Sequence, residues 1–290
     1  MRARTFLSVL FLVAVVGAAT GSSPVGAAPT AEAASMKRAA EVARAWPGSA
    51  KERSWLAEYW PWSLPEQWLP SGGFHDDADR QAFEDGRLTL RAAPPEAPGS
   101  GEVRWSSGAS LTLPLIPASR IAAHLTAGGP CPNCSAPLVI DAIRPGTRQV
   151  LTSRWQATVP TWEFTVEGYS EPFVYPAVAA NVAGPGHPPV PEVDIPGLAT
   201  VHRWTATSAD GSTVSVHVAH GACDRVLPGR VYETDRVVVL IGRTTVQSGS
   251  CIDVLVDAPA DYRLSRSLGN RPLLDAATGY AITVDPLSAG

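Results

Sequence analysis

The sequence predicts a mostly β protein with minor α, in which two small antiparallel-sheet domains follow an N-terminal helical, tryptophan-rich appendage. Short β-like runs separated by turn residues fill the chain after about residue 85, and a Pro/Gly-rich stretch at residues 181–197 divides them. Asp210-Gly211 between two alternating runs is a strong hairpin signal. A length of 290 residues also fits two domains.

Residues 1–27 are typical of a signal peptide. Arg2 and Arg4 precede a weakly polar to apolar run from Phe6 to Ala19, and small residues at 25–27 suit a signal peptidase. The alternative is an uncleaved anchor, although the run is shorter than the about 20 apolar residues that span a bilayer. We therefore expect a secreted or extracytoplasmic protein, with membrane contact only if the signal is uncleaved.

The charge of the chain argues against nucleic acid as a partner. Arg2 and Arg4 account for two of the 23 basic residues, so the mature chain keeps 21 basic side chains against 27 acidic ones. A surface with a net negative charge and no basic cluster repels phosphate backbones.

The four cysteines are expected to form disulfides because exported proteins meet an oxidising environment. Three pairings are formally possible, and the spacing favours Cys131 with Cys134 and Cys223 with Cys251. The second bond would close a loop of about 29 residues, which stabilises a domain by roughly 3–4 kcal/mol in the chain-entropy view.

Residues 28–84 form the predicted appendage. Ser35 to Trp46 reads as an amphipathic helix that Pro47-Gly48 ends, and five of the nine tryptophans follow within residues 46–68. Three prolines within that stretch, at 47, 61 and 65, and Pro70 just after it predict short turns instead of one long helix. A second, capped helix is expected from Asp76 to Gly86.

The tryptophan-rich stretch has two interpretations. Flat aromatic faces can stack on sugars or on hydrophobic partners, which makes a candidate ligand-binding set of Trp55, Trp60, Trp62 and Trp68. Alternatively, these side chains are mostly buried and hold the segment against the first domain.

Residues 85–180 are predicted to form a β-rich domain with one helix, from Pro117 to Leu125. A loop is expected at 94–101, and the predicted strands are 88–91, 103–105, 138–140, 148–152, 157–159, 162–166 and 173–178.

Residues 181–197 are predicted to be a linker, and residues 198–290 a second β domain of five or six strands. Val214, Val216 and Val218 alternate and should face its core. With a two-residue loop at Asp210-Gly211, Trp204 would lie across from His217. Later strands are expected at 231–232, 237–241, 251–256 and 280–284.

Several clusters have both a chemical and a structural interpretation. Cys131-x-x-Cys134 suits a redox or metal site, but it leads into a strand and lacks the helix that lowers a thiol pKa, which favours a structural disulfide. His75, Asp76, Asp77 and Asp79 could bind a cation, or they could cap a helix. On one predicted sheet face, His202 lies diagonal to His217, as a surface pair.

No motif identifies a catalytic site or a cofactor site. The patterns of serine hydrolases, zinc proteases, dinucleotide-binding folds and P-loops are absent from the sequence. Paired carboxylates of glycosidases lie close in space only, so Glu163, Glu167 and Glu171 stay unassigned. We expect no metal and no cofactor, and catalytic activity is the less favoured reading.

Three features of residues 85–285 form one pattern: the Cys131 motif with Pro137, the run from Thr152 to Phe164, and the run Leu268 to Gly279 after Cys251. In this pattern the chain resembles a family of exported or membrane-anchored actinobacterial proteins of uncharacterised activity. The family pattern implies glycine after Ser153-Arg154, where this chain has Trp155. If that position needs a positive φ, the local strand pairing is in doubt. Leu268 to Gly279 reads as a structural loop that buries Leu273 and Leu274.

These observations favour an exported binding or interaction module of the cell envelope, without catalytic activity, whose partner is an envelope polymer or protein. The alternative is a secreted hydrolase of envelope polymers with no recognisable motif. An exposed tryptophan groove would support binding, whereas a cleft with convergent carboxylate, histidine or serine side chains would support catalysis.

Overall fold

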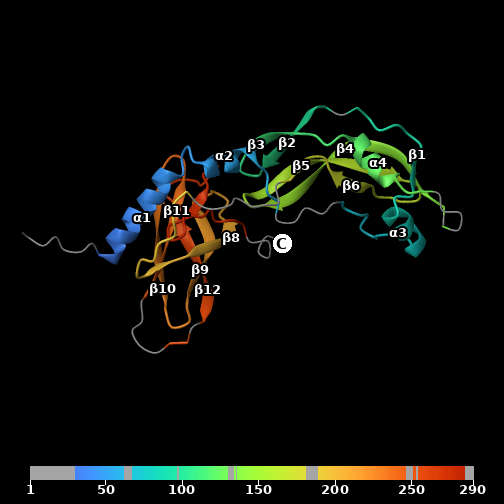
Figure 1. Ribbon diagram of the computed structural model, residues 1–290. Helices are drawn as coiled ribbons and strands as arrows, with labels where there is room; N and C mark the ends of the chain where they lie inside the picture. Colours follow the sequence, from blue (N-terminus) through green and yellow to red (C-terminus); the bar gives the residue numbers. More distant parts are fainter. Residues whose placement is uncertain are drawn as a thin grey trace, which may run out of the picture.

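The computed structural model describes residues 30–61, 67–96, 98–129, 134, 136–180, 189–245, 251–252 and 254–284. The protein is mostly β, and its strands form two lobes (Figure 1). The N-lobe holds the first six strands, between Leu88 and Pro176, with the helices Asp77–Glu84 and Ala118–Leu125; the C-lobe holds the other seven strands, between Leu198 and Asp275, with the helix Ala31–Ala45. The predicted signal peptide, residues 181–188 of the predicted linker, Trp62 and Cys131 lie outside the described residues. No described helix is both long enough and apolar enough to cross a membrane.

The N-lobe sheet is built around one long β-hairpin. Its strands are β4 (Leu138–Thr152) and β5 (Trp155–Val166), which pair from Ile140 opposite Val166 to Thr152 opposite Trp155, with one irregularity between Ile140 and Ala142. The sheet order is β1-β4-β5-β2-β3, with β6 also on β5; the remaining strands are β1 (Leu88–Leu90), β2 (Ser100–Trp105), β3 (Ser110–Pro114) and β6 (Phe173–Pro176).

The sequence predicted breaks inside both long strands, and these breaks are absent. Pro145 lies in β4 beyond the three residues that pair with β1, so no partner on that side needs its N–H. Pro160 lies in β5 between the part that pairs with β2 and the part that pairs with β6. Proline is tolerated at such unpaired positions, and the strands continue through it.

The two short helices that the sequence predicted after Asp76 and Pro117 are present, and both pack against this sheet. In α3 (Asp77–Glu84) the Asp76 carboxylate accepts the N–H of Asp79 at 2.9 Å, which explains the acidic cluster by capping. α4 (Ala118–Leu125) begins after Pro117 and buries Ala118, Ala122 and Leu125. Both helices pack on a core that includes Trp162, Phe164 and Phe173.

The C-lobe consists of two small sheets that enclose a core. One has β10 (Val226–Glu233), β11 (Val238–Thr244) and β13 (Leu273–Asp275), with β7 (Leu198–Ala199) on β11; the other has β12 (Leu255–Arg263), β9 (Thr213–Gly221) and β8 (Val201–Thr207). Val214, Val216 and Val218 face the core, as predicted. The expected strand at 280–284 makes only isolated bridges.

Two irregularities shift the register of the β8–β9 hairpin. Its residues near the turn pair as predicted, but Trp204 lies opposite Val216 instead of His217. Arg203, with a φ of +48°, lies in the irregular part. As a result His202 lies directly opposite His217, and the predicted diagonal placement of this pair is wrong.

Helix α1 (Ala31–Ala45) covers the outer face of β11, so this strand is buried on both sides. The helix begins four residues before the predicted start because Thr30 caps it. The guanidinium of Arg38 donates to the carbonyls of Ala276 at 3.0 Å and Pro191 at 2.5 Å. These bonds hold α1 on the lobe.

A third N-terminal helix, α2 (Ala50–Ala57), lies where the sequence predicted only turns. The Ser49 hydroxyl accepts the N–H of Glu52 at 3.0 Å, and the prolines at 47 and 61 flank the helix without entering it. Between those prolines, eight residues are enough for two turns.

The predicted disulfide between Cys223 and Cys251 is present, with 6.1 Å between the Cα atoms. It joins the end of β9 to the segment before β12. Cys134 is disulfide-bonded too, while its predicted partner Cys131 is not described. The described residues after Cys134 lead into β4, as expected for a structural bond.

Replacing Cys223 and Cys251 by serine is expected to lower the free energy of unfolding by roughly 3–4 kcal/mol, because the open chain gains the entropy of a 28-residue separation. Urea unfolding of the two forms measures the difference. The Cys131→Ser/Cys134→Ser variant serves as control, since its predicted bond closes a much shorter loop. An equal or larger loss in the control would contradict the loop-entropy origin.

Candidate functional site

Among the described residues, two segments that contact each other form a joint between the lobes. The first is the tip of the β4–β5 hairpin, and the second is the stretch from Trp55 to Pro61. Along that stretch Tyr59 is buried in an N-lobe core with Trp105, whereas Trp55 and Trp60 are buried in the core between α1 and β11. The N–H of Ser153 donates to the Trp60 carbonyl at 2.9 Å, so the joint is also hydrogen-bonded.

Thr152 organises the hairpin tip. Its buried hydroxyl donates to the carbonyl of Trp155 at 2.7 Å. It also accepts the Arg154 N–H at 3.0 Å and the indole N–H of Trp105 at 2.9 Å. One side chain therefore closes the two-residue turn of Ser153 and Arg154 and ties it to β2.

Trp155 has a φ of +84°, in the region that favours glycine. The resemblance implied glycine here, and the backbone has the positive φ that a glycine would serve. The strand pairing is nevertheless intact, since Thr152 pairs with Trp155. The Trp155 ring contacts that of Trp204, with ring centroids 5.4 Å apart. A strained residue of this kind costs about 1–3 kcal/mol and points to a functional or tertiary constraint at the tip.

Arg154 extends from the same turn into an aromatic environment. Its guanidinium carbon lies 3.7 Å from the ring centroid of Trp105 and 5.7 Å from that of Trp55. Nη1 donates to the Trp55 carbonyl at 2.5 Å. Burial lowers the pKa of Arg154 to about 10, so the side chain stays cationic at neutral pH.

A cleft of about 710 Å³ opens between the lobes at this joint. Its size fits a small ligand or a segment of a polymer. Aromatic, cationic and hydroxyl groups line it; they include Trp55, Arg154, Trp155 and Trp204 with Ser106, Ser107, Ser110, Ser208, Asp210, Ser267, Asn270 and Arg271. We call it the inter-lobe cleft.

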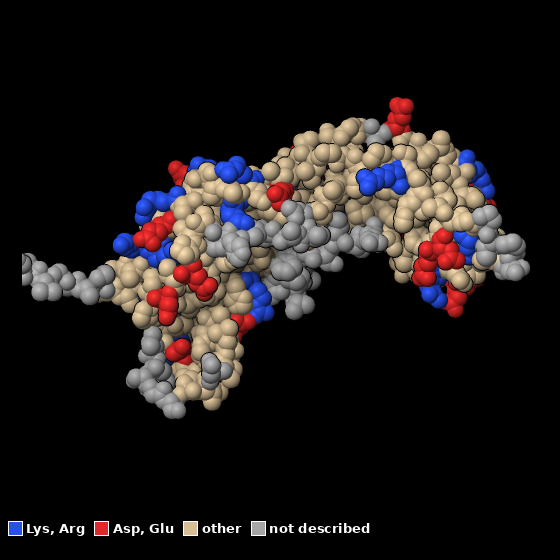
Figure 2. Space-filling model, in the orientation of Figure 1, with Lys and Arg blue, Asp and Glu red and all other residues tan. Residues whose placement is uncertain are grey.

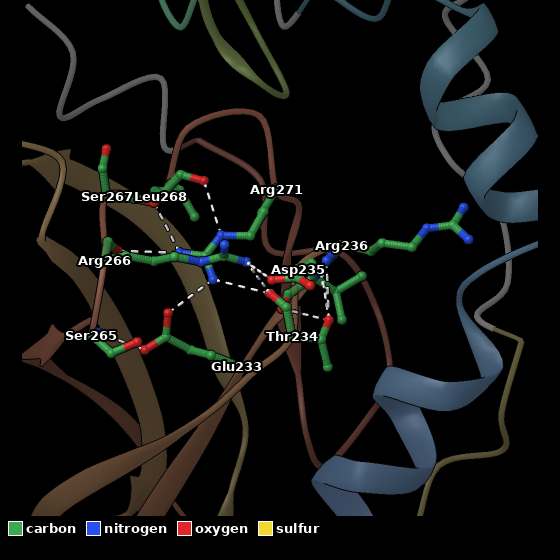
Figure 3. Close-up of polar contacts among 10 residues, drawn as sticks. Glu233, Thr234, Asp235, Arg236, Ser265, Arg266, Ser267, Leu268 and Arg271 are labelled. Carbon is green, nitrogen blue, oxygen red and sulfur yellow. Dashed lines mark hydrogen bonds and ion pairs between the residues drawn. The ribbon is translucent and has the colours of Figure 1, made fainter.

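The C-lobe wall of the inter-lobe cleft is held by Arg271 (Figure 3). Its guanidinium donates to Glu233 Oε2 at 2.8 Å and to the backbone carbonyls of Thr234, Arg266, Ser267 and Leu268. Burial acts to raise the pKa of Glu233, but hydrogen bonds from Ser265 and the ion pair with Arg271 outweigh it and lower that pKa. The wall is therefore rigidly cross-linked.

The run from Leu268 to Gly279 has the structural role that the sequence predicted. Leu273 and Leu274 are fully buried, and Gly279 has a φ of +75°. The buried Asp275 carboxylate accepts hydrogen bonds from Val201 and Thr278, although burial still raises its pKa.

Asp210 is the acidic residue of the cleft lining, and it is engaged within its own turn. Its carboxylate accepts bonds from the Ser208 hydroxyl at 2.6 Å and from the N–H and hydroxyl of Ser212 at 3.0 and 2.7 Å. These donors lower the pKa of Asp210 to about 2. It therefore stays ionised and is a poor proton donor at neutral pH.

The predicted ligand-binding tryptophans do not form one exposed surface. Trp55 lines the inter-lobe cleft but is only 5% exposed, and Trp60 is buried beside it. Trp68 pairs with Val174 in the N-lobe, and Trp62 is not described. Of the four, the structure places only Trp55 at the cleft.

The remaining candidates lie elsewhere and apart from one another. His75 stacks on Tyr169 beside α3, Glu167 pairs with Arg91, and Glu171 accepts bonds from Ser71. The Glu163 side chain lies against Gly146 in the hairpin. His202 bonds Asp257 at 2.8 Å on the C-lobe sheet. Among the described residues, no three His, Cys, Asp or Glu side chains are grouped to hold a metal ion.

Sequence reasoning missed Arg154, Trp155 and Trp204 as a site. They lie close together only because the hairpin tip reaches the C-lobe, which no spacing in the chain reveals. One signal was available: tryptophan at a position where the resemblance implied glycine. No family model, curated protein or solved structure matches this chain.

Substitution of Trp155 tests the strain at the tip. Both Trp155→Ala and Trp155→Gly lose the contact with Trp204, but only glycine relaxes the positive φ. We expect Trp155→Gly to be about 1 kcal/mol more stable than Trp155→Ala, the reverse of the usual order within a strand. Chemical denaturation measures both variants, and a more stable alanine variant would rule out the strained backbone.

The Asp210 pKa gives a pH prediction. A lowered folded pKa contributes stability that is present above the ordinary pKa near 4 and is lost as pH falls towards 2. Carboxyl NMR titration should place the Asp210 pKa at about 2, and Ser208→Ala should raise it. Ser107→Ala lines the same cleft without bonding Asp210 and is the control; a Ser208→Ala titration that matches wild type would contradict this assignment.

Proposed function

We propose that this protein is an exported binding module of the cell envelope, without catalytic activity, and that the inter-lobe cleft holds a segment of an envelope polysaccharide. The observation that carries the proposal is the lining of that cleft. Indole rings, serine hydroxyls and the Arg154 guanidinium line it together. Aromatic faces and hydroxyl donors are the groups with which proteins contact sugar rings.

An exported location is supported by the disulfide chemistry. Cys223 is bonded to Cys251, Cys134 is also bonded, and no described cysteine is free. Such bonds persist in oxidising compartments. The basic and apolar start of the chain fits the same location.

The surface charge supports a partner other than nucleic acid. On the face drawn in Figure 2, basic and acidic side chains are mixed over the C-lobe and around α3, and few charges lie over the strands between them. This face has no continuous basic stripe that could follow a phosphate backbone.

Binding fits the cleft better than hydrolysis does. Polysaccharide hydrolysis uses two carboxyl groups, one of them with a raised pKa as general acid. The described cleft lining holds one carboxylate, Asp210, whose pKa is lowered and whose oxygens are engaged by Ser208 and Ser212. The lining therefore lacks the acid that this reaction requires.

Sedimentation of the mature chain with purified cell-wall polysaccharide tests the proposal. Wild type is expected to co-sediment, while Trp155→Ala and Ser208→Ala/Ser267→Ala should bind at least about 10-fold more weakly, because stacking and hydroxyl contacts are lost. Leu90→Ala, which alters an exposed residue of the N-lobe, is the control.

Two results would contradict the proposal. One is equal binding of all four proteins, which would place the ligand outside the cleft. The other is release of soluble sugar during long incubation, which would favour the hydrolase alternative. Thermal unfolding of each variant is recorded alongside, so that loss of fold is separated from loss of contact.

A further inference from the structure

We infer that Arg154 makes the inter-lobe cleft selective for saccharides that carry an oxyanion, either a carboxylate or a phosphate, over neutral saccharides of the same ring. This inference rests on the proposed function and names the ligand chemistry of that site. It follows from the bonding state of the arginines at and near the cleft.

Two arginines line the cleft, and only one has donors to spare. Arg271 makes five hydrogen bonds, one of them to the Glu233 carboxylate and four to backbone carbonyls. Arg154 makes one, from Nη1 to the Trp55 carbonyl. A guanidinium has five N–H groups, so four of those of Arg154 have no acceptor among the described residues.

The charge of Arg154 also lacks a counterion. Among the described residues no carboxylate lies within ion-pair distance of its guanidinium, although the protein pairs most of its other arginines. The acidic residue in the same lining, Asp210, accepts three hydrogen bonds inside its own turn. The Arg154 guanidinium is therefore a positive charge in the cleft lining that a ligand anion can pair with.

The surroundings of Arg154 suit bidentate recognition. The guanidinium carbon of Arg154 lies 3.7 Å from the ring centroid of Trp105, and the hydrogen bond from Nη1 to the Trp55 carbonyl fixes one edge of the guanidinium plane. A guanidinium held in one plane presents parallel N–H groups that match the two oxygens of a carboxylate or phosphate. Because the site is partly buried, solvent screens such a pair less than it screens a surface pair.

The position of Trp155 links the charge to a sugar ring. It follows Arg154 directly, contacts Trp204 across the joint and lines the same cleft. Its backbone keeps a φ of +84° that glycine would adopt without strain. The indole of Trp155 can stack on a sugar ring while the neighbouring Arg154 guanidinium pairs with an acidic substituent of that ring.

Two matched ligand pairs test the inference with the wild-type protein. Hexagalacturonate is compared with its methyl ester, and 6-phosphomaltohexaose with maltohexaose, by titration calorimetry at low salt. We expect the acidic member of at least one pair to bind 10-fold or more tightly than its neutral form. Preference in the carboxylate pair alone, or in the phosphate pair alone, identifies the oxyanion.

Arg154→Gln should abolish the preference, so that the acidic member of a pair binds no more than about 3-fold more tightly than its neutral form. Arg154→Lys keeps the positive charge but lacks the planar arrangement of N–H groups, so it should retain only part of the preference for the acidic ligand. Arg120→Gln, which removes one positive charge from the exposed face of α4, is the matched control and should keep the full preference.

The outcomes separate the two proposals. Equal binding of acidic and neutral members by wild type, or an unchanged preference in Arg154→Gln, overturns the inference while the cleft remains a saccharide site. Failure of wild type to bind cell-wall polysaccharide and all four oligosaccharides overturns the proposed function as well. Equal binding by wild type overturns the inference without any variant, and Arg154→Lys still tests the role of the arginine if Arg154→Gln does not fold.

Discussion

The insertion of the β4–β5 hairpin tip between the two lobes is the contact on which the rest of the structure depends. Thr152 closes the turn with three hydrogen bonds, Arg154 stacks on Trp105 and bonds the Trp55 backbone, and Trp155 meets Trp204. Residues 55–61 complete the joint, because Tyr59 is buried in an N-lobe core whereas Trp55 and Trp60 are buried in the core between α1 and β11. Removing this contact would leave two small domains with exposed aromatic surfaces.

The same joint explains why strain and unpaired charge occur together. Trp155 contacts Trp204 from a backbone with positive φ, and Arg154 extends to the aromatic rings from the turn beside it. Cores usually avoid both features, since left-handed backbone and unpaired buried charge each reduce stability. Their coincidence at the cleft, next to a wall cross-linked by Arg271, is the reason to place binding there (Figure 3).

Much of the fold could be predicted because local chemistry controls it. Capping predicted the helix after Asp76, and a starting proline with an apolar face predicted the helix after Pro117. Alternation predicted the inward valines of β9, and spacing predicted the bond between Cys223 and Cys251. Predictions from local sequence failed where the pairing with other strands controls the structure. Pro145 and Pro160 stay in strands because neighbouring strands end beside them, and bulges near Arg203 shifted His202 to face His217.

The sequence by itself determined the mostly β class, the helix capped by Asp76 and the C-lobe disulfide. These follow from interactions within a few residues, or from the few ways in which cysteines can pair. Only the tertiary structure decided the site, since Trp55, Arg154, Trp204 and Asp210 come from distant parts of the chain. Their meeting depends on how a hairpin tip packs between two lobes, which periodicity and spacing do not encode.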